Sequence, residues 1–382
     1  MAFYLAFKEM WRNKGRFFLF SLVIALITVL VLFIAALAQG LAEANRQYLE
    51  KLNAQLIVFQ SKVELSTTAS RIAWDKLNDI RRVPGVTEIG PVGFSSGTIV
   101  FSNGKKSLDV SLIGAEPGQP GMALALSGEN IRSSRGYITV IDANVAKQTN
   151  IKVGDEIVIK TIQDAKDQFN KVKVIGITDS RAYFFQPSIF LPFETWDKIK
   201  PQASIPNNQT EQVANIVAVQ IQDPGEYPAM AKLIQSQVGD VDVVDPKTAY
   251  EATPGYQAQQ STLNTQRAFT LLIGILVIGG FFQIQTLQKV PQIGVLKAVG
   301  TTNPSVAGSI ILQIIMVTIV GVIIGTLGTL ALTLLLPAGV PIIVAGDTAV
   351  IAILSLLLIG PIGGMVSVRL ALRVEPLRAL GM

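Results

Sequence analysis

Residues 17–38 read FFLFSLVIALITVLVLFIAALA, an apolar run without a charged residue. At 1.5 Å per residue, a helix of this length crosses a hydrocarbon core of about 30 Å. Three further uncharged apolar runs occupy 268–286, 306–336 and 349–368, whereas 39–267 has the composition of a soluble domain. The sequence therefore predicts an integral membrane α-helical protein with four transmembrane helices and one large domain on one side.

The formal net charge of +5 is unevenly distributed along the chain. Residues 39–266 hold 22 Lys and Arg against 24 Asp and Glu, a net charge of −2, and the other residues hold 10 against 3, a net charge of +7. The excess positive charge belongs to the membrane part, which argues against nucleic-acid binding by the large domain.

The orientation in the membrane follows from where the cations lie. They occupy the N-terminal segment 1–16, the connection 287–305 and the tail 369–382, whereas the loop 337–348 holds neither Lys nor Arg. The positive-inside rule places the three basic segments in the cytoplasm, and therefore 39–267 and 337–348 on the extracytoplasmic side of the cell membrane. Aromatic residues share one helical face of 1–16, which predicts a short interfacial helix there.

The first apolar run has an alternative interpretation as a cleaved signal peptide. Ala36-Leu37-Ala38 resembles a signal-peptidase site. The run is, however, longer than the roughly 7–15 residues of a signal-peptide core. We therefore favour an uncleaved membrane anchor.

Several function classes are excluded by absent residue types. The chain contains no Cys and no His, which removes thiol chemistry and the commonest general base and metal ligand. None of the four apolar runs contains Asp, Glu, Lys or Arg, the groups that couple ion gradients to transport at membrane depth. No segment fits the phosphate-binding loop of an ATPase. The chain is therefore predicted to be non-catalytic and to draw its energy from another subunit.

The large domain reads as α+β. A helix around 70–83 ends at Pro84-Gly85, and a second helix begins near Glu226 between the last two strands. We expect a β-rich insertion over 118–208, ending in a linker over 201–208, within an α/β unit made of 54–117 and 209–250. β-type runs bounded by turn residues are found at 56–60, 98–101, 107–113, 137–141, 156–161, 171–177, 188–191, 216–221 and 241–244, and Asn103-Gly104 predicts a hairpin turn.

Helical stalks are predicted on both sides of the large domain. Leu41, Tyr48, Leu52 and Leu56 keep a near-heptad spacing after the first span. Residues 257–267 are polar and free of Gly and Pro, and are expected to form the matching stalk before the second span.

Small residues recur at helical spacing in the last two spans. Gly321 and Gly325 form one small-xxx-small pair, and Gly360 and Gly364 form another. Such pairs permit close helix approach. They fit packing within one chain and a dimer seam equally well.

The connection 287–305 carries a further short helix. The pattern predicts a helix over 292–299 that ends at Gly300. Ile293, Leu296 and Val299 would lie along one apolar face. An exposed apolar face on a cytoplasmic helix indicates a docking partner.

This segment resembles a known family. The run 293–300, IGVLKAVG, is similar to the E-I-G-x-L-K/R-A-x-G signature of FtsX/MacB-type ABC transporter permeases, and Glu375-Pro376 with Ala379-Leu380 is similar to their terminal D-P-x-x-A-L motif. Val83-Pro84-Gly85-Val86 and Val153-Gly154-Asp155 match stretches of the family's outer domain. The likeness covers the whole chain.

The resemblance implies a homodimer that is bound to two cytoplasmic ATPase subunits, which use the ATP. It also implies an outer domain built from an α/β unit with a β-rich insertion, and no cofactor held by this chain. The resemblance assigns ATPase coupling to the 287–305 connection, through Gln292, Ile293, Gly294, Val295, Leu296, Lys297 and Gly300.

Gln292 stands where most of the family has Glu, and this departure resembles a subgroup of haem-exporter permeases of the Hrt type. Haem then becomes the expected substrate, held in the outer leaflet between the first two spans. Residues near that level are candidate ligands or hydrogen-bonding groups, although each also fits a stalk-surface or packing role. They are Gln39, Glu43, Tyr48, Tyr256, Gln257 and Gln260.

Two other interpretations of the same architecture stay open. In one, the machine exports a lipid, a lipoprotein or a peptide. In the other, it transports nothing and moves its outer domain to regulate an envelope hydrolase.

Overall fold

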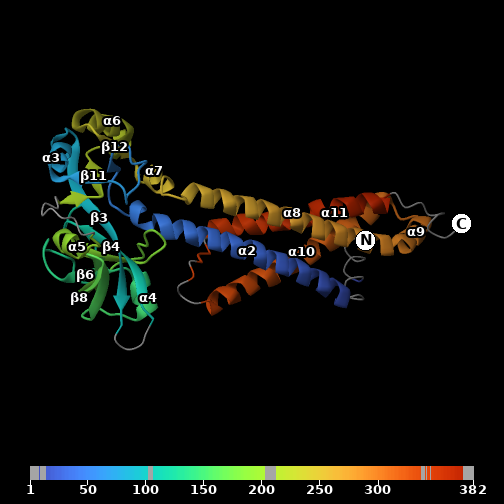
Figure 1. The fold of residues 1–382 in the computed structure, drawn as a ribbon. Coiled ribbons are helices and arrows are strands. Elements are labelled where there is room, and N and C mark those ends of the chain that lie inside the picture. The colour runs from blue at the N-terminus through green and yellow to red at the C-terminus, as the bar shows by residue number, and fades with distance from the viewer. Residues whose placement is uncertain are drawn as a thin grey trace. The chain divides into compact units, whose positions relative to one another are not determined.

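The computed structural model describes Lys8 and residues 14–101, 106–202, 212–336, 340, 342–344 and 346–372. The chain divides into two compact units, which are described separately (Figure 1). The membrane unit consists of Met1–Gly40 and Gln260–Met382, and the outer unit of Leu41–Gln259. Most of the expected interfacial helix, the Asn103-Gly104 turn, 203–208 of the expected linker and the terminal motif lie outside the described residues.

Four helices of the described chain are long and apolar enough to cross a membrane. Each contains an uncharged apolar run, and a helix is the structure in which such a run satisfies all its backbone polar groups inside a bilayer. The helices are α2 (Lys14–Glu50), α8 (Tyr256–Gln288), α10 (Asn303–Leu335) and α11 (Gly346–Leu372), and the short α9 (Val290–Ala298) connects α8 to α10. Both α2 and α8 extend past their apolar runs, so the polar stretch 257–267 is helical as expected.

The glycine pairs of α10 and α11 pack within the chain. A Cβ at Gly321 would lie 2.6 Å from Ile24 Cβ of α2, and one at Gly325 would lie 2.5 Å from Thr28 Cβ. On α11, a Cβ at Gly360 would lie 2.2 Å from the Thr318 hydroxyl of α10. These contacts answer the question left open by the sequence, because the small residues let helices of one chain approach closely.

The outer unit is an α+β domain, as expected. Its strands are β1 (Leu56–Gln60), β2 (Ile72–Ala73), β3 (Val86–Val100), β4 (Leu108–Ala115), β5 (Ser127–Gly128), β6 (Ile138–Ile141), β7 (Glu156–Gln163), β8 (Lys166–Ile177), β9 (Ser188–Pro192), β10 (Val213–Ala214), β11 (Ile216–Ile221) and β12 (Val241–Val244). Its helices are α3 (Trp74–Arg82), α4 (Ala143–Thr149), α5 (Phe193–Ile199), the 3₁₀ turn η1 (Pro224–Glu226), α6 (Tyr227–Val238) and α7 (Pro246–Glu251).

One half of the outer unit is a sheet covered by two helices. Strand β1 lies between β11 and β12 and is antiparallel to both, so the expected strand–helix–strand unit is split by β1. Helices α3 and α6 cover this sheet, as Figure 1 shows. Leu56, Val58 and Val219 of the sheet and Ile80 and Ile234 of the helices are fully buried in this layer.

The other half closes on itself. Strand β3 pairs with β4, β4 with β9, β9 with β6, β6 with β8, β8 with β7, and β7 returns to β3. The ring is a six-stranded barrel around apolar side chains that include Ile99, Leu112, Ile159 and Val174. Closure removes exposed strand edges.

The barrel draws strands from both sides of the expected insertion boundary. Strands β3 and β4 end before residue 118, and the first half of β3 also pairs with β11 of the α/β half. The expected insertion 118–208 therefore supplies β6 to β9 but not the whole barrel. Only 98–101 was expected as a strand here, and the first part of β3 holds Gly90, Pro91 and Gly93, residue types that usually weaken strands. A Cβ at Gly93 would lie 2.2 Å from the ring of Trp196, so the missing side chain makes room for that indole.

Candidate functional site

Helix α9 is defined at both ends by local sequence. Pro291 occupies the first turn, where its missing N–H is tolerated. At the other end Gly300 has φ +97°, a conformation that favours glycine. The N–H of Thr301 donates to Leu296 O at 3.0 Å and that of Gly300 donates to Lys297 O at 3.0 Å, which is the bonding pattern of a Schellman cap.

The two faces of α9 differ in burial. Ile293 is 5 % exposed and packs with Val306 and Ala371 of the same chain. Lys297 Nζ donates to Leu372 O at 2.9 Å. Gln292, Val295, Leu296 and Val299 are exposed, and Val299 is 82 % exposed.

The prediction of the docking face is therefore wrong for one of its three residues. Ile293, Leu296 and Val299 were expected to share an exposed face, but Ile293 points into the membrane unit. Gly294 is buried with it. The largest apolar side chains that α9 and its C-cap residue leave exposed are Val295, Leu296 and Val299.

Tyr48 is a core residue and not a solvent-facing stalk residue. Its side chain is fully buried, and its hydroxyl donates to Gly121 O at 2.8 Å. Its ring contacts Phe94, Tyr183 and Phe190, with centroid separations between 5.6 and 6.0 Å. The candidate ligand Tyr48 therefore packs into the core of the outer unit instead of facing the stalk surface.

Burial in the same core also explains the near-heptad spacing of the predicted first stalk. Leu49, Leu52 and Leu56 are also buried to within 1 % exposure. The spacing therefore records the end of α2 and the start of β1 entering the domain core, rather than a stalk in solvent.

The other candidate ligands are partly engaged by the protein. Glu43 forms an ion pair with Arg46, which also lies 3.6 Å from Glu50. Tyr256 packs edge-to-face against Tyr250, with ring centroids 5.8 Å apart. Gln257, in the outer unit, is exposed. Gln39 and Gln260, in the membrane unit, are half-buried.

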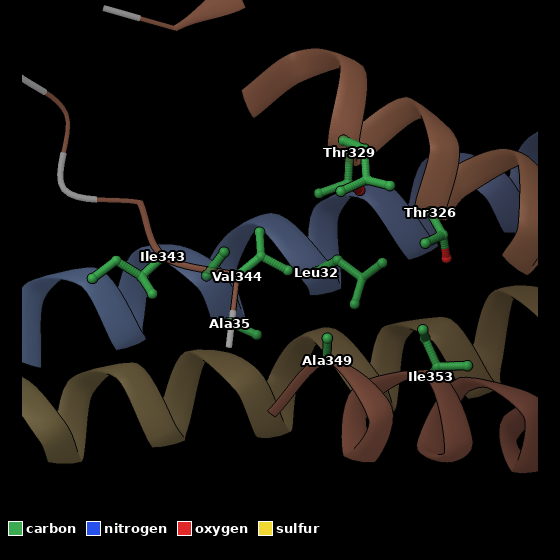
Figure 2. Close-up of a pocket in the computed structure, with 10 residues that line it drawn as sticks. Leu32, Ala35, Thr326, Thr329, Ile343, Val344, Ala349 and Ile353 are labelled. Carbon is green, nitrogen blue, oxygen red and sulfur yellow. The ribbon is translucent and has the colours of Figure 1, made fainter. Parts of the chain in front are cut away.

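The membrane unit contains a small apolar cavity between helices. Leu32 and Ala35 of α2, Thr326 and Thr329 of α10 and Ile353 of α11 line it, with Ile343 and Val344 closing one side (Figure 2). Its volume is about 40 Å³. Sites for organic ligands usually have about 300–1,000 Å³. The described cavity is therefore far too small for a macrocycle.

A charged network fixes the segment that follows α2, and no sequence pattern pointed to it. Lys51 Nζ lies 2.7 Å from Asp179 Oδ2, and Arg181 Nε lies 2.7 Å from Asp179 Oδ1. Partial burial alone would raise the pKa of Asp179, but hydrogen bonds from Lys51 and Arg181 outweigh it and lower the pKa to about 2. Lys51 is 128 residues from Asp179 and 130 from Arg181 in sequence, so only the fold brings it to them.

Two family models match the chain. The model described as MacB-like periplasmic core domain matches residues 17–237, and the model described as FtsX-like permease C-terminal matches 268–376. Together they cover most of the outer unit and the apolar run of each of the four membrane helices, and residues 238–267 lie between the two matches.

Relatives of similar length match over nearly the whole chain. A protein of Staphylococcus haemolyticus described as "Putative hemin transport system permease protein HrtB" is 26% identical, with 99% of each chain covered. A protein of the same description from Staphylococcus epidermidis is 24% identical, again with 99% of each covered. An uncharacterized ABC transporter permease of Mycobacterium tuberculosis is 23% identical, with 98% of each covered.

Solved structures match about half of the chain. The extracellular domain of the noncanonic ABC-type transporter YknZ from Gram-positive bacteria matches with 17% identity and a TM-score of 0.35, covering 50% of this chain and 99% of that one. The periplasmic region of MacB from Actinobacillus actinomycetemcomitans matches with 16% identity and a TM-score of 0.36, covering 51% and 90%.

Proposed function

The chain is a membrane permease subunit of the MacB/FtsX family of ABC transporters, and from this premise we propose that it exports haem or hemin with energy from ATP. It acts as a homodimer with two cytoplasmic ATPase subunits and holds no cofactor of its own. Both termini and α9 lie in the cytoplasm, as the distribution of Lys and Arg indicates.

The likeness to hemin transport permeases over 99% of both chains carries the cargo proposal. The departure at Gln292, which resembles the same subgroup, is part of that likeness. Haem is a flat apolar macrocycle with two carboxylates, so it partitions into a membrane and needs an exporter that works from the lipid phase.

Coupling begins at α9. The exposed Val295, Leu296 and Val299 seat in the ATPase, while Ile293 and the Lys297 ammonium fasten α9 to the helices of its own chain. A displacement of α9 by the ATPase therefore moves the membrane helices with it, since the fastening contacts are buried.

We leave Tyr48 out of the proposed haem site and keep the other candidate residues at the ends of α2 and α8. These are Gln39, Glu43, Tyr256, Gln257 and Gln260. Because the described cavity of about 40 Å³ does not accommodate haem, the site opens between helices of two copies or during the ATP cycle. The least enclosed span, α8, has only 22% of its apolar window buried within the chain, which leaves a face for the second copy or for lipid.

Mechanotransmission is the second candidate, and one observation favours it. The end of α2 is built into the core of the outer unit through Tyr48, Leu49 and Leu52. A helix that is anchored in this way transmits displacement to the domain without any cargo. The lipid, lipoprotein and peptide cargoes have no comparable observation in their favour.

Hemin transfer from proteoliposomes tests the proposal. The permease and its ATPase are reconstituted with hemin in the membrane, and transfer to apomyoglobin on the outer-unit side is followed by the Soret band. ATP-dependent transfer is expected, and a Leu296→Glu variant is expected to abolish it. Transfer that proceeds equally without ATP would remove hemin as the cargo.

A further inference from the structure

The outer unit also contains a cavity, and its described lining includes none of the candidate ligands at the ends of α2 and α8. It has a volume of about 550 Å³, within the range of organic-ligand sites. Strands β3 and β4, the turn after Ala182 and helix α5 contribute its walls. Its principal side chains are Arg71, Phe94, Tyr183, Phe184, Trp196 and Lys200.

Aromatic rings form the floor of this cavity. Phe94 and Tyr183 stack with centroids 4.5 Å apart and an interplanar angle of 26°. Trp196 is held in place by its indole N–H, which donates to Ser95 Oγ at 2.8 Å. Burial raises the pKa of the Tyr183 phenol to about 12, so this ring stays uncharged at neutral pH. Stacked, locked rings favour a flat apolar ligand.

Cationic groups stand at the rim. Lys200 Nζ lies 4.8 Å from the centroid of the Trp196 ring and 2.6 Å from Asp197 Oδ1. Arg71 donates from one terminal nitrogen to Thr68 O and Ser70 O, both at 2.7 Å, out of the five N–H donors of a guanidinium. The described lining residues include two cations and no carboxylate. Because Asp197 offsets the charge of Lys200, the net positive charge of the described rim comes from Arg71, and it favours an anion.

An exposed aromatic turn forms one edge of the cavity. Phe184 and Phe185 have φ of 47° and 63°, and Tyr183 and Gln186 exchange backbone hydrogen bonds of 3.0 and 3.1 Å around them. Both central positions of this tight turn favour Asn or Gly, and bulky residues there cost about 1 kcal/mol each. The two rings are nevertheless 46 % and 44 % exposed. A strained turn that displays aromatic rings is typical of a binding site.

We propose that this cavity binds a flat, apolar anion, which stacks on the Phe94 and Phe184 rings and places its acidic group between Arg71 and Lys200. The ligand class follows from the lining itself. One part of the proposal rests on the proposed function. If the chain exports hemin, then hemin, with its carboxylates, is the physiological ligand and the cavity binds the cargo during export.

Trp196 provides a local reporter for the test. The chain has three tryptophans, Trp11, Trp74 and Trp196, so a full-length variant with Trp11→Phe and Trp74→Phe retains one indole. The probe is 6-bromo-2-naphthoate, whose bromine quenches indole fluorescence at contact distance. The variant is titrated in lipid nanodiscs, with the uncharged 6-bromo-2-naphthamide as the comparison. Saturable quenching by the anion, and weaker quenching by the amide, are expected.

Matched substitutions separate the cavity from the nearby surface. Phe184→Ser and Arg71→Glu are each expected to weaken naphthoate binding by about tenfold, the equivalent of about 1.4 kcal/mol. Phe185→Ser, in the same strained turn but outside the lining, and Arg82→Glu on the exposed end of α3 are expected to leave it within about twofold. Thermal unfolding of each variant confirms that it folds.

The results also distinguish this inference from the exporter proposal. Absence of saturable Trp196 quenching would contradict the proposed ligand site. Equal losses of naphthoate affinity in Phe184→Ser and Phe185→Ser would contradict it too. Neither result would affect the evidence from ATP-dependent hemin transfer. Saturable quenching without ATP-dependent hemin transfer would support the proposed ligand site and contradict hemin export. Competition by hemin against naphthoate is the result expected if both are right.

Discussion

The Tyr48 hydroxyl donates a hydrogen bond to Gly121 O across 2.8 Å inside the core of the outer unit. The donor belongs to α2, the same continuous helix that forms the first membrane span. The end of that helix is therefore a structural part of the domain. If α2 moves along its axis, the domain must move with it or the packing around Tyr48 must break, because densely packed cores resist shear.

Tyr48→Phe separates a structural role from a ligand role. Gly121 is buried, so the lost hydroxyl leaves its carbonyl without this donor, and we expect the outer unit to lose about 1–3 kcal/mol of unfolding free energy. Tyr137→Phe, at a 52 % exposed position, is expected to change it by less than about 0.5 kcal/mol. Chemical unfolding of the full chain in nanodiscs measures both. Normal stability with loss of hemin-stimulated ATPase activity would instead restore Tyr48 as a ligand.

A negative charge on the exposed face of α9 should uncouple the machine. Leu296→Glu or Val299→Glu places a carboxylate in the proposed ATPase seat, and we expect loss of at least about tenfold in stimulated ATPase activity. Gly294→Glu should act similarly, because Gly294 is buried where α9 meets its own chain. Asn303→Glu adds the same charge at the exposed start of α10, where a helix N-terminus tolerates it, and serves as the control. Full coupling in the α9 variants would show that this helix is not the seat.

The Asp179 network predicts a weakening of the outer unit in acid. The folded-state pKa is about 2, below the unfolded value of about 3.9, so this stabilisation is complete above about pH 4 and is lost as pH falls toward 2. The Asp179 side chain is 34% exposed, so solvent screening limits the effect to about 1 kcal/mol. Unfolding midpoints of wild type and Asp179→Asn, taken between pH 5 and 2, should converge as the pH drops. Parallel curves would mean that the network contributes nothing.

Two glycines of the membrane unit should respond oppositely to enlargement. Gly321→Leu places a side chain where Ile24 and the Ser21 carbonyl already lie, and we expect the yield of folded protein to fall sharply. Gly280→Leu meets nothing within 4 Å in the chain and should fold. Size-exclusion chromatography in detergent measures both yields. A shift of Gly280→Leu from dimer to monomer would place the seam of the homodimer on α8. Normal folding of Gly321→Leu would contradict the intrachain packing.

Sequence periodicity predicted the regular elements well because their causes are local. The strands at 56–60, 216–221 and 241–244 are found within the same bounds, since each is a short run of β-branched and apolar residues bounded by turns. The helix in 287–305 was also predicted, because Gly300 is a local stop signal. Its orientation was not, because the burial of Ile293 depends on Val306 and Ala371 in other helices.

The features that sequence reasoning missed depend on distant partners. The glycines of β3 look like strand breakers until Trp196 is seen to pack on them. Tyr48 looks like a stalk residue until β3, β9 and the turn at Tyr183 surround it. The run Tyr183-Phe184-Phe185 was the one available signal for the cavity of the outer unit, as three consecutive aromatic residues in a short polar loop.

The ATPase activity of the permease co-purified with its ATPase in lipid nanodiscs, measured with and without hemin, tests the central claim most directly. We expect hemin to stimulate the activity in a saturable manner, with a Soret shift on the permease, and the Leu296→Glu variant to lose the stimulation while it still binds hemin. An activity that is indifferent to hemin at all concentrations would contradict haem export and leave mechanical transmission or export of another cargo.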